Sequence, residues 1–540
     1  MSAVRKGMRV PILTAEEAAA KIPPGATVAV TGAGGGITEP TSLIDALAER
    51  FRRTGEPNGL TLLHTTGLGD RADRGMSPLA IQGMNRRVIG GHWGQSPRLA
   101  EMAEANEIEA YCLPQGVISQ LFRAAAAGQP GILTHIGLGT CVDPRAGGGK
   151  LNARTTEDLV KLMEIDGREW LFYPAVKPTV ALLRGTTADT DGYVSMEDEI
   201  AYLDGLAMAQ ATHNAGGLVF VQVKRLVRAG TLHPRNVRIP GFLVDGLIVC
   251  PEQAQLYDAP TNRFFSGDYA AEIEKTPPMP LDERKAIVRR ALMQVSPGDV
   301  GNIGVGVSDG IGAVAGEEGL ADDFVLTVET GPIGGITAKG IFFGASVNAR
   351  ALVDMPSQFD FYGGGGLDVC FLSFAEVDAA GNVNVSRFNG KIQGVGGFID
   401  IAGSSKKLVF NGTLTAGGLK TRVGDGRIEI VSEGRFKKFV PQVEEVSFSA
   451  EEALKRGKEV LYITERAVFR LVPGGLELIE IAPGMEPERD VFPHMAFRPA
   501  VSANLKEMDA RFFTDGPMGI AGEWRGKRIE LQQSGGSKNA

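Results

Sequence analysis

A single carboxylate, Glu329, follows an apolar run and precedes a turn rich in glycine and proline. Residues 324–328 read FVLTV, and the turn that follows reads TGPIGG. β-Branched and aromatic residues favour a strand, so Glu329 should project at its carboxyl end, where open α/β sheets bind ligands. A carboxylate there can act as a nucleophile, a base or a hydrogen-bond anchor. The residues alone leave a plainer interpretation open, in which Glu329 is a solvated residue that caps the loop.

Glycine clusters supply a second kind of chemistry, because their backbone N–H groups can approach a phosphate or a developing oxyanion. The clusters lie at 32–36, 304–306, 331–335, 363–366 and 394–397. Gln115, in the turn YCLPQG at 111–116, adds a side-chain amide donor. None of the loops has the GxxxxGK[ST] spacing of a P-loop, and GAGGG at 32–36 lacks full GxGxxG spacing, so a dinucleotide signal there is weak. Tight turns remain the plain alternative for each cluster.

One match to the GxSxG pattern, GVSDG at 306–310, raises a serine hydrolase as a further alternative. The order serine, acid, histidine leaves only His494 downstream of Ser308 as a base. The same residues are typical of a glycine turn whose serine and aspartate cap a following helix. The six histidines show no HxH or HxxxH pair, so the sequence does not predict a metal site.

The elements that must position these residues alternate between helix and strand. Thr14 and Glu17 have capping-box spacing at the start of a helix that Pro23-Pro24 ends. A short strand is predicted at 27–31, then the glycine loop, then a helix at 41–52. The same order begins again with a helix predicted at 282–293. This alternation predicts α/β folding with parallel strands.

Two echoes between the halves predict a duplicated α/β domain. Pro24-Gly25 corresponds to Pro297-Gly298, and the stretch 183–194 resembles the stretch 372–383 in the same order. We expect a first domain at 1–280, a second at 281–525 and a disordered tail at 526–540. Common turn motifs could produce such echoes by coincidence, which is the alternative.

Composition limits the classes of function. The chain has 540 residues, 72 of them glycine, with 43% hydrophobic and 22% charged residues and a net charge of −8. Glycine is roughly twice as frequent as usual, yet the composition is that of a globular chain. The acidic balance argues against a nucleic-acid-binding surface. No apolar stretch approaches the length that crosses a bilayer, and four widely spaced cysteines fit no disulfide framework. We expect a soluble cytoplasmic protein without nucleic-acid or membrane partners.

Seven segments together resemble the single-polypeptide family I CoA-transferases of the acetate or propionate type. They are GAGGGITEPTSLI (32–44), GLGDRADRG (67–75), GHWGQSP (91–97), YCLPQGV (111–117), QPGILTHIGLGTCVDPR (129–145), VETGPIGGI (328–336) and GVGGFIDI (394–401). The resemblance runs from residue 9 to about residue 519. It implies two similar open α/β domains with largely parallel sheets and an active site at the domain interface.

The resemblance also implies a chemistry. Glu329 would attack the thioester of a short-chain acyl-CoA and form a glutamyl-CoA thioester, which a second carboxylate such as acetate or propionate then resolves in a ping-pong scheme. Gln115 and the backbone N–H groups of Gly396 and Gly397 would stabilise the oxyanions. The loop with Asn302, Gly304 and Gly306, together with Gly394, would contact coenzyme A.

Coenzyme A would then be a substrate, and no tightly bound cofactor or metal is expected. The resemblance suggests a homodimer or homotetramer. Hydrolysis of acyl-CoA by the same glutamate stays open, as do a nicotinamide-dependent oxidoreductase and a nucleotide- or sugar-phosphate-binding protein.

Overall fold

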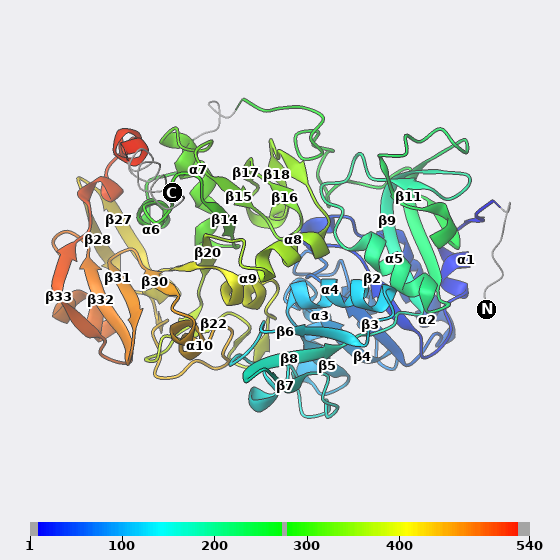
Figure 1. Cartoon of the computed structure of the whole chain (residues 1–540), viewed down its shortest axis with the longest axis horizontal. Helices are drawn as coiled ribbons and strands as arrows, with labels where there is room; N and C mark the ends of the chain where they lie inside the picture. The colour runs from blue at the N-terminus through cyan, green and yellow to red at the C-terminus, as the bar shows by residue number, and fades with distance from the viewer. Residues whose placement is uncertain (1–8, 273–277, 527–540) are drawn as a thin grey trace.

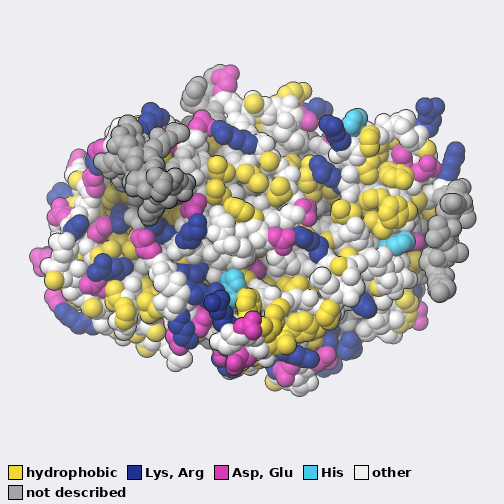
Figure 2. Space-filling model, viewed as in Figure 1, with side chains coloured by type: hydrophobic (Ala, Val, Ile, Leu, Met, Phe, Trp, Pro, Cys, Tyr) yellow, Lys and Arg dark blue, Asp and Glu magenta, His cyan; other side chains and the backbone are white. Residues whose placement is uncertain are grey.

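Two α/β domains lie side by side in the chain, each built on its own ten-stranded sheet (Figure 1). The computed structural model describes residues 9–272 and 278–526. The predicted tail falls outside the described residues except for Gly526, and the predicted boundary at residue 280 adjoins the undescribed stretch 273–277. The domain limits 1–280 and 281–525 therefore stay predictions. Within the described part, no helix combines the length and hydropathy needed to cross a lipid bilayer. On the face of the molecule in Figure 2, Lys and Arg side chains are interspersed with Asp, Glu and hydrophobic side chains.

The first sheet has a parallel path of eight strands, to which the short antiparallel strands β10 (Val194–Ser195) and β12 (Val237–Ile239) are added. Its order is β1 (Ile12–Leu13), β13 (Gly246–Val249), β11 (Leu218–Val227), β9 (Val180–Asp189), β2 (Thr27–Val30), β3 (Leu60–His64), β4 (Asn85–Gly90) and β5 (Glu109–Cys112). All ten residues of β9 are buried, as expected for a central strand covered on both faces. The helices of this half are α1 (Ala15–Ala20), α2 (Thr41–Thr54), α3 (Pro97–Glu104), α4 (Gln115–Ala126) and α5 (Gly205–Asn214).

The second sheet is parallel in its centre and mixed at its ends. Its order is β19 (Ala351–Leu352), β16 (Pro332–Ile333), β15 (Val325–Thr327), β14 (Val300–Ile303), β20 (Val369–Ser373), β25 (Lys407–Asn411), β30 (Glu459–Ile463), β31 (Ala467–Val472), β32 (Gly475–Ile481) and β33 (Ala500–Glu507). Strands β15 to β30 run parallel, whereas β16, β19 and β31 pair antiparallel. The helices are α6 (Glu283–Leu292), α7 (Ile311–Glu317), α8 (Met355–Gly363), α9 (Phe398–Ser404) and α10 (Ala450–Lys455).

The predicted duplication is confirmed in the turns that precede β2 and β14. Gly25 and Gly298 both adopt the left-handed region, with φ of 71° and 90°, which favours glycine. Each N–H donates to a carbonyl of the connection ahead of the neighbouring strand, at Asn58 and Asp323, and both distances are 2.8 Å. In each sheet this strand lies between equivalent partners, β9 and β3 in the first and β20 and β15 in the second.

The second echo is also a shared turn. Asp189 Oδ1 accepts the N–H groups of Asp191 and Tyr193 at 3.0 and 3.1 Å. In the second domain Asp378 Oδ1 accepts the equivalent N–H groups, from Ala380 and Asn382, at 3.0 and 2.9 Å. An aspartate that binds two backbone donors ahead of it closes an Asx-type turn, so the matched letters in the sequence correspond to one matched structure.

The two domains share hydrophobic cores. Ile392, Val395 and Ile399 of the second half belong to the core of the first domain. Conversely, residues of the first half such as Ile37 and Leu203 belong to the core that contains α8. The interface between the domains is therefore packed like an interior, which holds groups from the two halves in fixed relation.

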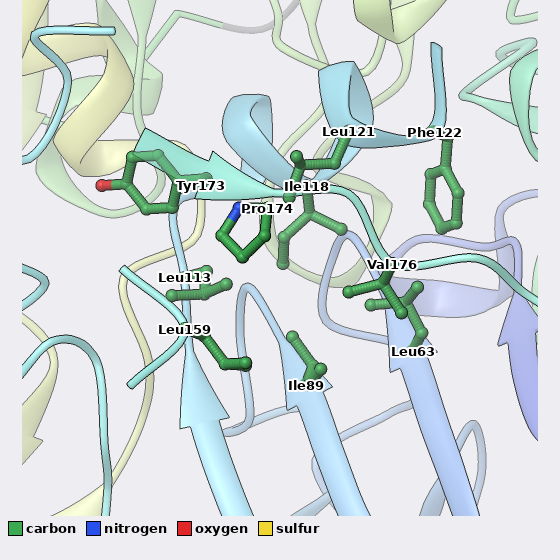
Figure 3. A pocket seen from close by; sticks show the side chains of 10 residues that line it. All are labelled: Leu63, Ile89, Leu113, Ile118, Leu121, Phe122, Leu159, Tyr173, Pro174 and Val176. Carbon is green, nitrogen blue, oxygen red and sulfur yellow. The ribbon is translucent and has the colours of Figure 1, made fainter. Parts of the chain in front are cut away.

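Helix α4 packs between the first sheet and a small antiparallel sheet of β6 (Gly131–Thr134), β8 (Arg168–Pro174) and β7 (Lys161–Ile165). Figure 3 shows its side chains Ile118 and Leu121 directed toward Leu113, Pro174 and the ends of β3 and β4. Phe122 of the same face is 1% exposed. Apolar packing of this face therefore fixes the position of a helix whose first residue is Gln115.

We expect Phe122→Ala to lower the free energy of unfolding by about 3–5 kcal/mol, because it removes a buried aromatic ring and leaves a cavity. Arg123→Ala on the same helix is the matched control, since its side chain is 45% exposed and an exposed ion pair contributes about 0–1 kcal/mol. Urea unfolding followed by circular dichroism measures both. Equal effects of the two variants would contradict this account of the packing.

Candidate functional site

Glu329 lies at the tip of a tight reversal at the carboxyl end of β15. The strand ends at Thr327, one residue earlier than the run of apolar residues predicted. The N–H of Val328 donates to the carbonyl of Pro332 at 3.0 Å, which turns the chain into the antiparallel strand β16. Gly331 has φ of 126°, and a Cβ there would meet the Val353 carbonyl oxygen at 2.2 Å. The glycine and proline residues after Glu329 are thus required by this reversal.

The side chain of Glu329 is half-buried, and one of its two carboxylate oxygens is shielded from water. Its Oε2 is enclosed and has no hydrogen-bond partner within the described part of the chain. Burial raises the pKa of Glu329 to about 7, although hydrogen bonds from its own backbone and from Asn302 oppose that rise. A carboxylate that loses part of its solvation is a stronger nucleophile once it is ionised. The solvated loop residue that the sequence left open does not describe this environment.

Asn302 supports Glu329 from the neighbouring strand β14. Its side chain is fully buried, and Nδ2 donates to the Thr327 carbonyl at 3.3 Å and to the Tyr362 hydroxyl at 3.2 Å. Its backbone pairs with β15 and β20 on either side. The expectation that its backbone N–H contacts coenzyme A is therefore wrong for this conformation, because a central strand uses its N–H in the sheet.

Gln115 starts α4 and faces the second domain. Its backbone N–H donates to the Gly396 carbonyl at 2.9 Å. Its side-chain Nε2 lies 3.8 Å from the Met355 sulfur, and a thioether is a weak acceptor. The residue is 4% exposed. A buried amide with such a weak partner retains the capacity to donate to a charged oxygen, which fits the predicted oxyanion role.

The glycines at 394–397 cross the interface, but two of their N–H groups are already used. The N–H of Gly396 donates to the Gly91 carbonyl at 2.7 Å, and that of Gly394 donates to the Ser386 carbonyl at 3.0 Å. The expectations of an oxyanion donor at Gly396 and a coenzyme A donor at Gly394 are corrected accordingly, since these donors hold the two domains and the loop together. Gly397 directly precedes α9, and the oxyanion role expected of its N–H stays a prediction.

In the loop after β14, too, one predicted donor is already bonded within the protein, and another has no such bond among the described residues. The N–H of Gly304 donates to the Phe371 carbonyl at 2.7 Å, so it is a structural bond and the predicted contact to coenzyme A through this group is corrected. Gly306 has φ of 111°, and a Cβ there would lie 2.6 Å from Ser373 Oγ. The predicted contact to coenzyme A from this loop therefore remains with Gly306.

The hydrolase alternative finds no support in the geometry. Ser308 is buried, and its hydroxyl accepts a hydrogen bond from Asn411 Nδ2 at 2.9 Å. His494 Nε2 instead lies 3.5 Å from Glu433 Oε1. A nucleophilic serine needs its base within hydrogen-bond reach, and these contacts assign the two residues to different partners.

Helix α8 joins the two groups of residues at the domain interface, where Figure 1 shows it between the sheets. Met355 at its start contacts Gln115, and Tyr362 near its end binds Asn302 beside Glu329. Seven helical residues span about 10 Å. The helix therefore brings both predicted groups to one interface and sets their spacing.

Two residues of this interface were missed by sequence reasoning. Tyr362 donates its hydroxyl proton to Thr327 Oγ1 at 2.8 Å and is fully buried; an aromatic residue in a short helix carries no signal of such a role. Asp400 lies within the motif at 394–401, and the N–H of Gly116 donates to its Oδ2 at 3.1 Å. Its position within that motif is the feature of the sequence that could have identified Asp400 as a residue of the interface.

Comparison with known proteins gives concordant results. The family model described as Coenzyme A transferase matches residues 12–249. The chain is 58% identical to acetate CoA-transferase YdiF of Escherichia coli K12 over 95% of this chain and 97% of that protein. It is 43% identical to caffeate CoA-transferase of Acetobacterium woodii over 93% and 97% of the two chains.

A solved structure supports the same assignment. The E. coli O157:H7 acyl-CoA transferase YdiF, in a thioester complex with CoA, matches with a TM-score of 0.91 and 57% identity, covering 95% of this chain and 97% of that one. Identity at this level over nearly the whole length, with the same two-domain α/β architecture, establishes homology. The chain therefore belongs to the coenzyme A transferase family.

Proposed function

We propose that this enzyme transfers coenzyme A from a short-chain acyl-CoA to a carboxylic acid such as acetate, through a glutamyl-CoA thioester on Glu329. The observation that carries the proposal is the enclosed carboxylate at the carboxyl end of β15, which has an unpartnered oxygen and a raised pKa. The names of the E. coli and A. woodii relatives, an acetate and a caffeate CoA-transferase, support the reaction class. Acyl-CoA and carboxylates are its partners, and coenzyme A is a substrate.

The proposed steps use only this chain's groups and the substrates. A Glu329 oxygen attacks the thioester carbonyl, and collapse of the tetrahedral intermediate releases CoA thiolate and leaves an acyl-glutamyl anhydride. The thiolate then attacks the glutamyl carbonyl, giving the glutamyl-CoA thioester and the free first acid. A second carboxylate reverses these steps. Each attack places negative charge on a carbonyl oxygen, which the Gln115 amide and the Gly397 N–H would stabilise.

The raised pKa of Glu329 fits this chemistry. At pH 7 about half of the Glu329 carboxylate is ionised and can attack, and the ionised fraction rises above that pH, while partial burial keeps the ionised ground state high in energy. A cytoplasmic location, a homodimeric or homotetrameric state and the domain limits 1–280 and 281–525 remain predictions alongside this function.

Borohydride trapping tests the nucleophile. After incubation with acetyl-CoA, a thioester at Glu329 should be reduced to the alcohol, and mass spectrometry should find the change only in the peptide that contains residue 329. Glu329→Ala should abolish both this mass change and turnover, while the circular dichroism spectrum stays native. If an active preparation shows the mass change on another peptide instead, the proposed mechanism is wrong.

Isotope exchange separates transfer from hydrolysis. With propionyl-CoA and labelled acetate, a transferase yields labelled acetyl-CoA at the rate at which propionyl-CoA disappears. Release of free CoA without labelled acetyl-CoA would instead identify a hydrolase that uses the same glutamate.

The pH dependence of thioester formation should report Glu329. Because protonation removes the nucleophile, the rate should fall about tenfold per pH unit below an apparent pKa near 7. Asn302→Leu deletes a hydrogen bond that lowers this pKa, so the acid limb should move to higher pH. Gln358→Leu, which removes a bond to Tyr362 alone, is the matched control and should leave the limb in place.

An acid limb that does not move in Asn302→Leu would belong to another buried carboxyl group. Asp204, whose pKa burial raises to about 6, and Asp400, whose pKa burial raises to about 7, are the groups to exclude.

Gln115→Ala should lower kcat by about 10²–10³-fold, because it removes a side-chain donor to the developing oxyanion. The KM for acetyl-CoA should change little, since the ground-state carbonyl gains less from the same donor. Steady-state kinetics measures both constants, and a change confined to KM would argue against the oxyanion role.

A further inference from the structure

The first turn of α4 is capped from the other domain. The residue before the helix, Pro114, offers no side-chain cap, and the first N–H groups of any helix lack partners within it. Asp400 of α9 fills this gap: its Oδ2 accepts the Gly116 N–H at 3.1 Å, and the Val117 N–H also bonds to its carboxylate. Asp400 is 3% exposed. A carboxylate at a helix N-terminus is favoured by charge-assisted bonds and by the helix dipole.

The approach is close enough to require glycine. A Cβ at Gly116 would lie 2.6 Å from Asp400 Oδ1 and 2.3 Å from the Phe359 ring. Only an unsubstituted backbone lets the carboxylate and α8 reach the helix together. On the other side of this turn, the Gln115 N–H is held by the Gly396 carbonyl at 2.9 Å. The backbone N–H groups of three consecutive residues, 115–117, therefore all donate hydrogen bonds to the second domain.

We propose that Asp400 is a positioning residue that fixes the Gln115 side-chain amide in its oxyanion-stabilising place, acting across the domain interface through the backbone of α4. This inference rests on the proposed function. Among the described residues, the amide nitrogen has only the weak contact to Met355 to orient it, so its direction depends on the backbone that carries it. A displacement of about 1 Å at a reacting group can lower a rate about 10²-fold.

A general role in docking the domains is the competing explanation, and the same helix supplies its control. Farther along α4, Arg123 and Gln120 bind Asp360 of α8 at 2.5 and 2.9 Å. These contacts also cross the interface, but they lie two turns from Gln115 and face an open cleft that Asp400 lines as well. If Asp400 only docked the domains, Asp360 would matter in the same way.

Burial, backbone hydrogen bonds and nearby ionisable side chains all affect the charge state of Asp400. Burial raises its pKa to about 7, and the backbone bonds from Gly116 and Val117 oppose that rise. Tyr173 of β8 interacts with it electrostatically, and Arg123 and Asp360 lie along the same cleft. Measurements at pH 8.5 therefore keep Asp400 and Glu329 ionised, and differences between variants then report position rather than protonation.

The test compares single-turnover thioester formation from acetyl-CoA at pH 8.5 in the whole enzyme. Asp400→Ala should slow it about 10–100-fold, with the KM for acetyl-CoA within about twofold. Asp400→Asn keeps one acceptor oxygen and should recover most of the rate. Asp360→Ala should stay within about twofold of the wild type, and circular dichroism should be native throughout.

A double-mutant cycle decides between the explanations. If Asp400 acts through Gln115, then Asp400→Ala should slow the Gln115→Ala enzyme less than about twofold further. Multiplicative losses, or equal losses in Asp360→Ala, would overturn the proposal. Should Asp400→Ala fail to fold, the same cycle with Asp400→Ser, whose shorter side chain keeps a polar group but not the carboxylate, replaces it. Absence of a thioester in the wild type would instead refute the proposed function, which separates the two failures.

Discussion

A half-buried carboxylate, one oxygen of which is enclosed and has no partner among the described residues, is the constraint on which the rest of this site depends. Burial alone would favour the protonated form of Glu329, and the two hydrogen bonds that oppose it leave the pKa near neutrality. The network that supplies one of these bonds, Asn302 with Tyr362 and Thr327, is itself buried and spans β14, β15 and α8. The two strands and the helix are thus fixed around the Glu329 carboxylate. Burial and these hydrogen bonds together set its pKa, as the function of an ionisable site residue requires.

The duplication explains how such a site can sit between two domains. Both domains place glycine turns at the carboxyl ends of parallel strands, and the shared Asx turns and left-handed glycines show that the same local devices were used twice. The interface differs from a simple pairing of halves because each core contains residues of the other half. Packing at interior density then holds α8, which contacts Gln115 at one end and Asn302 near the other, in a fixed position between the two domains.

Backbone donors show where sequence reasoning reached its limit. The sequence predicts glycine clusters around the site, since glycine alone allows such close approach. Three of the predicted donors, at Gly304, Gly394 and Gly396, instead satisfy carbonyl groups of neighbouring strands and loops. A sequence pattern indicates that a backbone N–H is accessible to a close neighbour, but it does not indicate which acceptor the N–H meets. For Gly394 the acceptor is the nearby Ser386, whereas for Gly396 it is Gly91 in the other half of the chain. Every buried donor needs a partner, and most find one within the protein.

The sequence by itself determined the α/β class, the duplication and the identity of Glu329 and Gln115 as candidates, because local propensity, turn chemistry and motif spacing are written in neighbouring residues. The tertiary structure decided which groups surround them. The Asn302 bond to Glu329, the placement of α8 and the capping of α4 by Asp400 all join segments far apart in the chain. The burial of Glu329, and with it the raised pKa of its carboxyl group, exists only once the chain has folded, because desolvation is a property of the assembled interior.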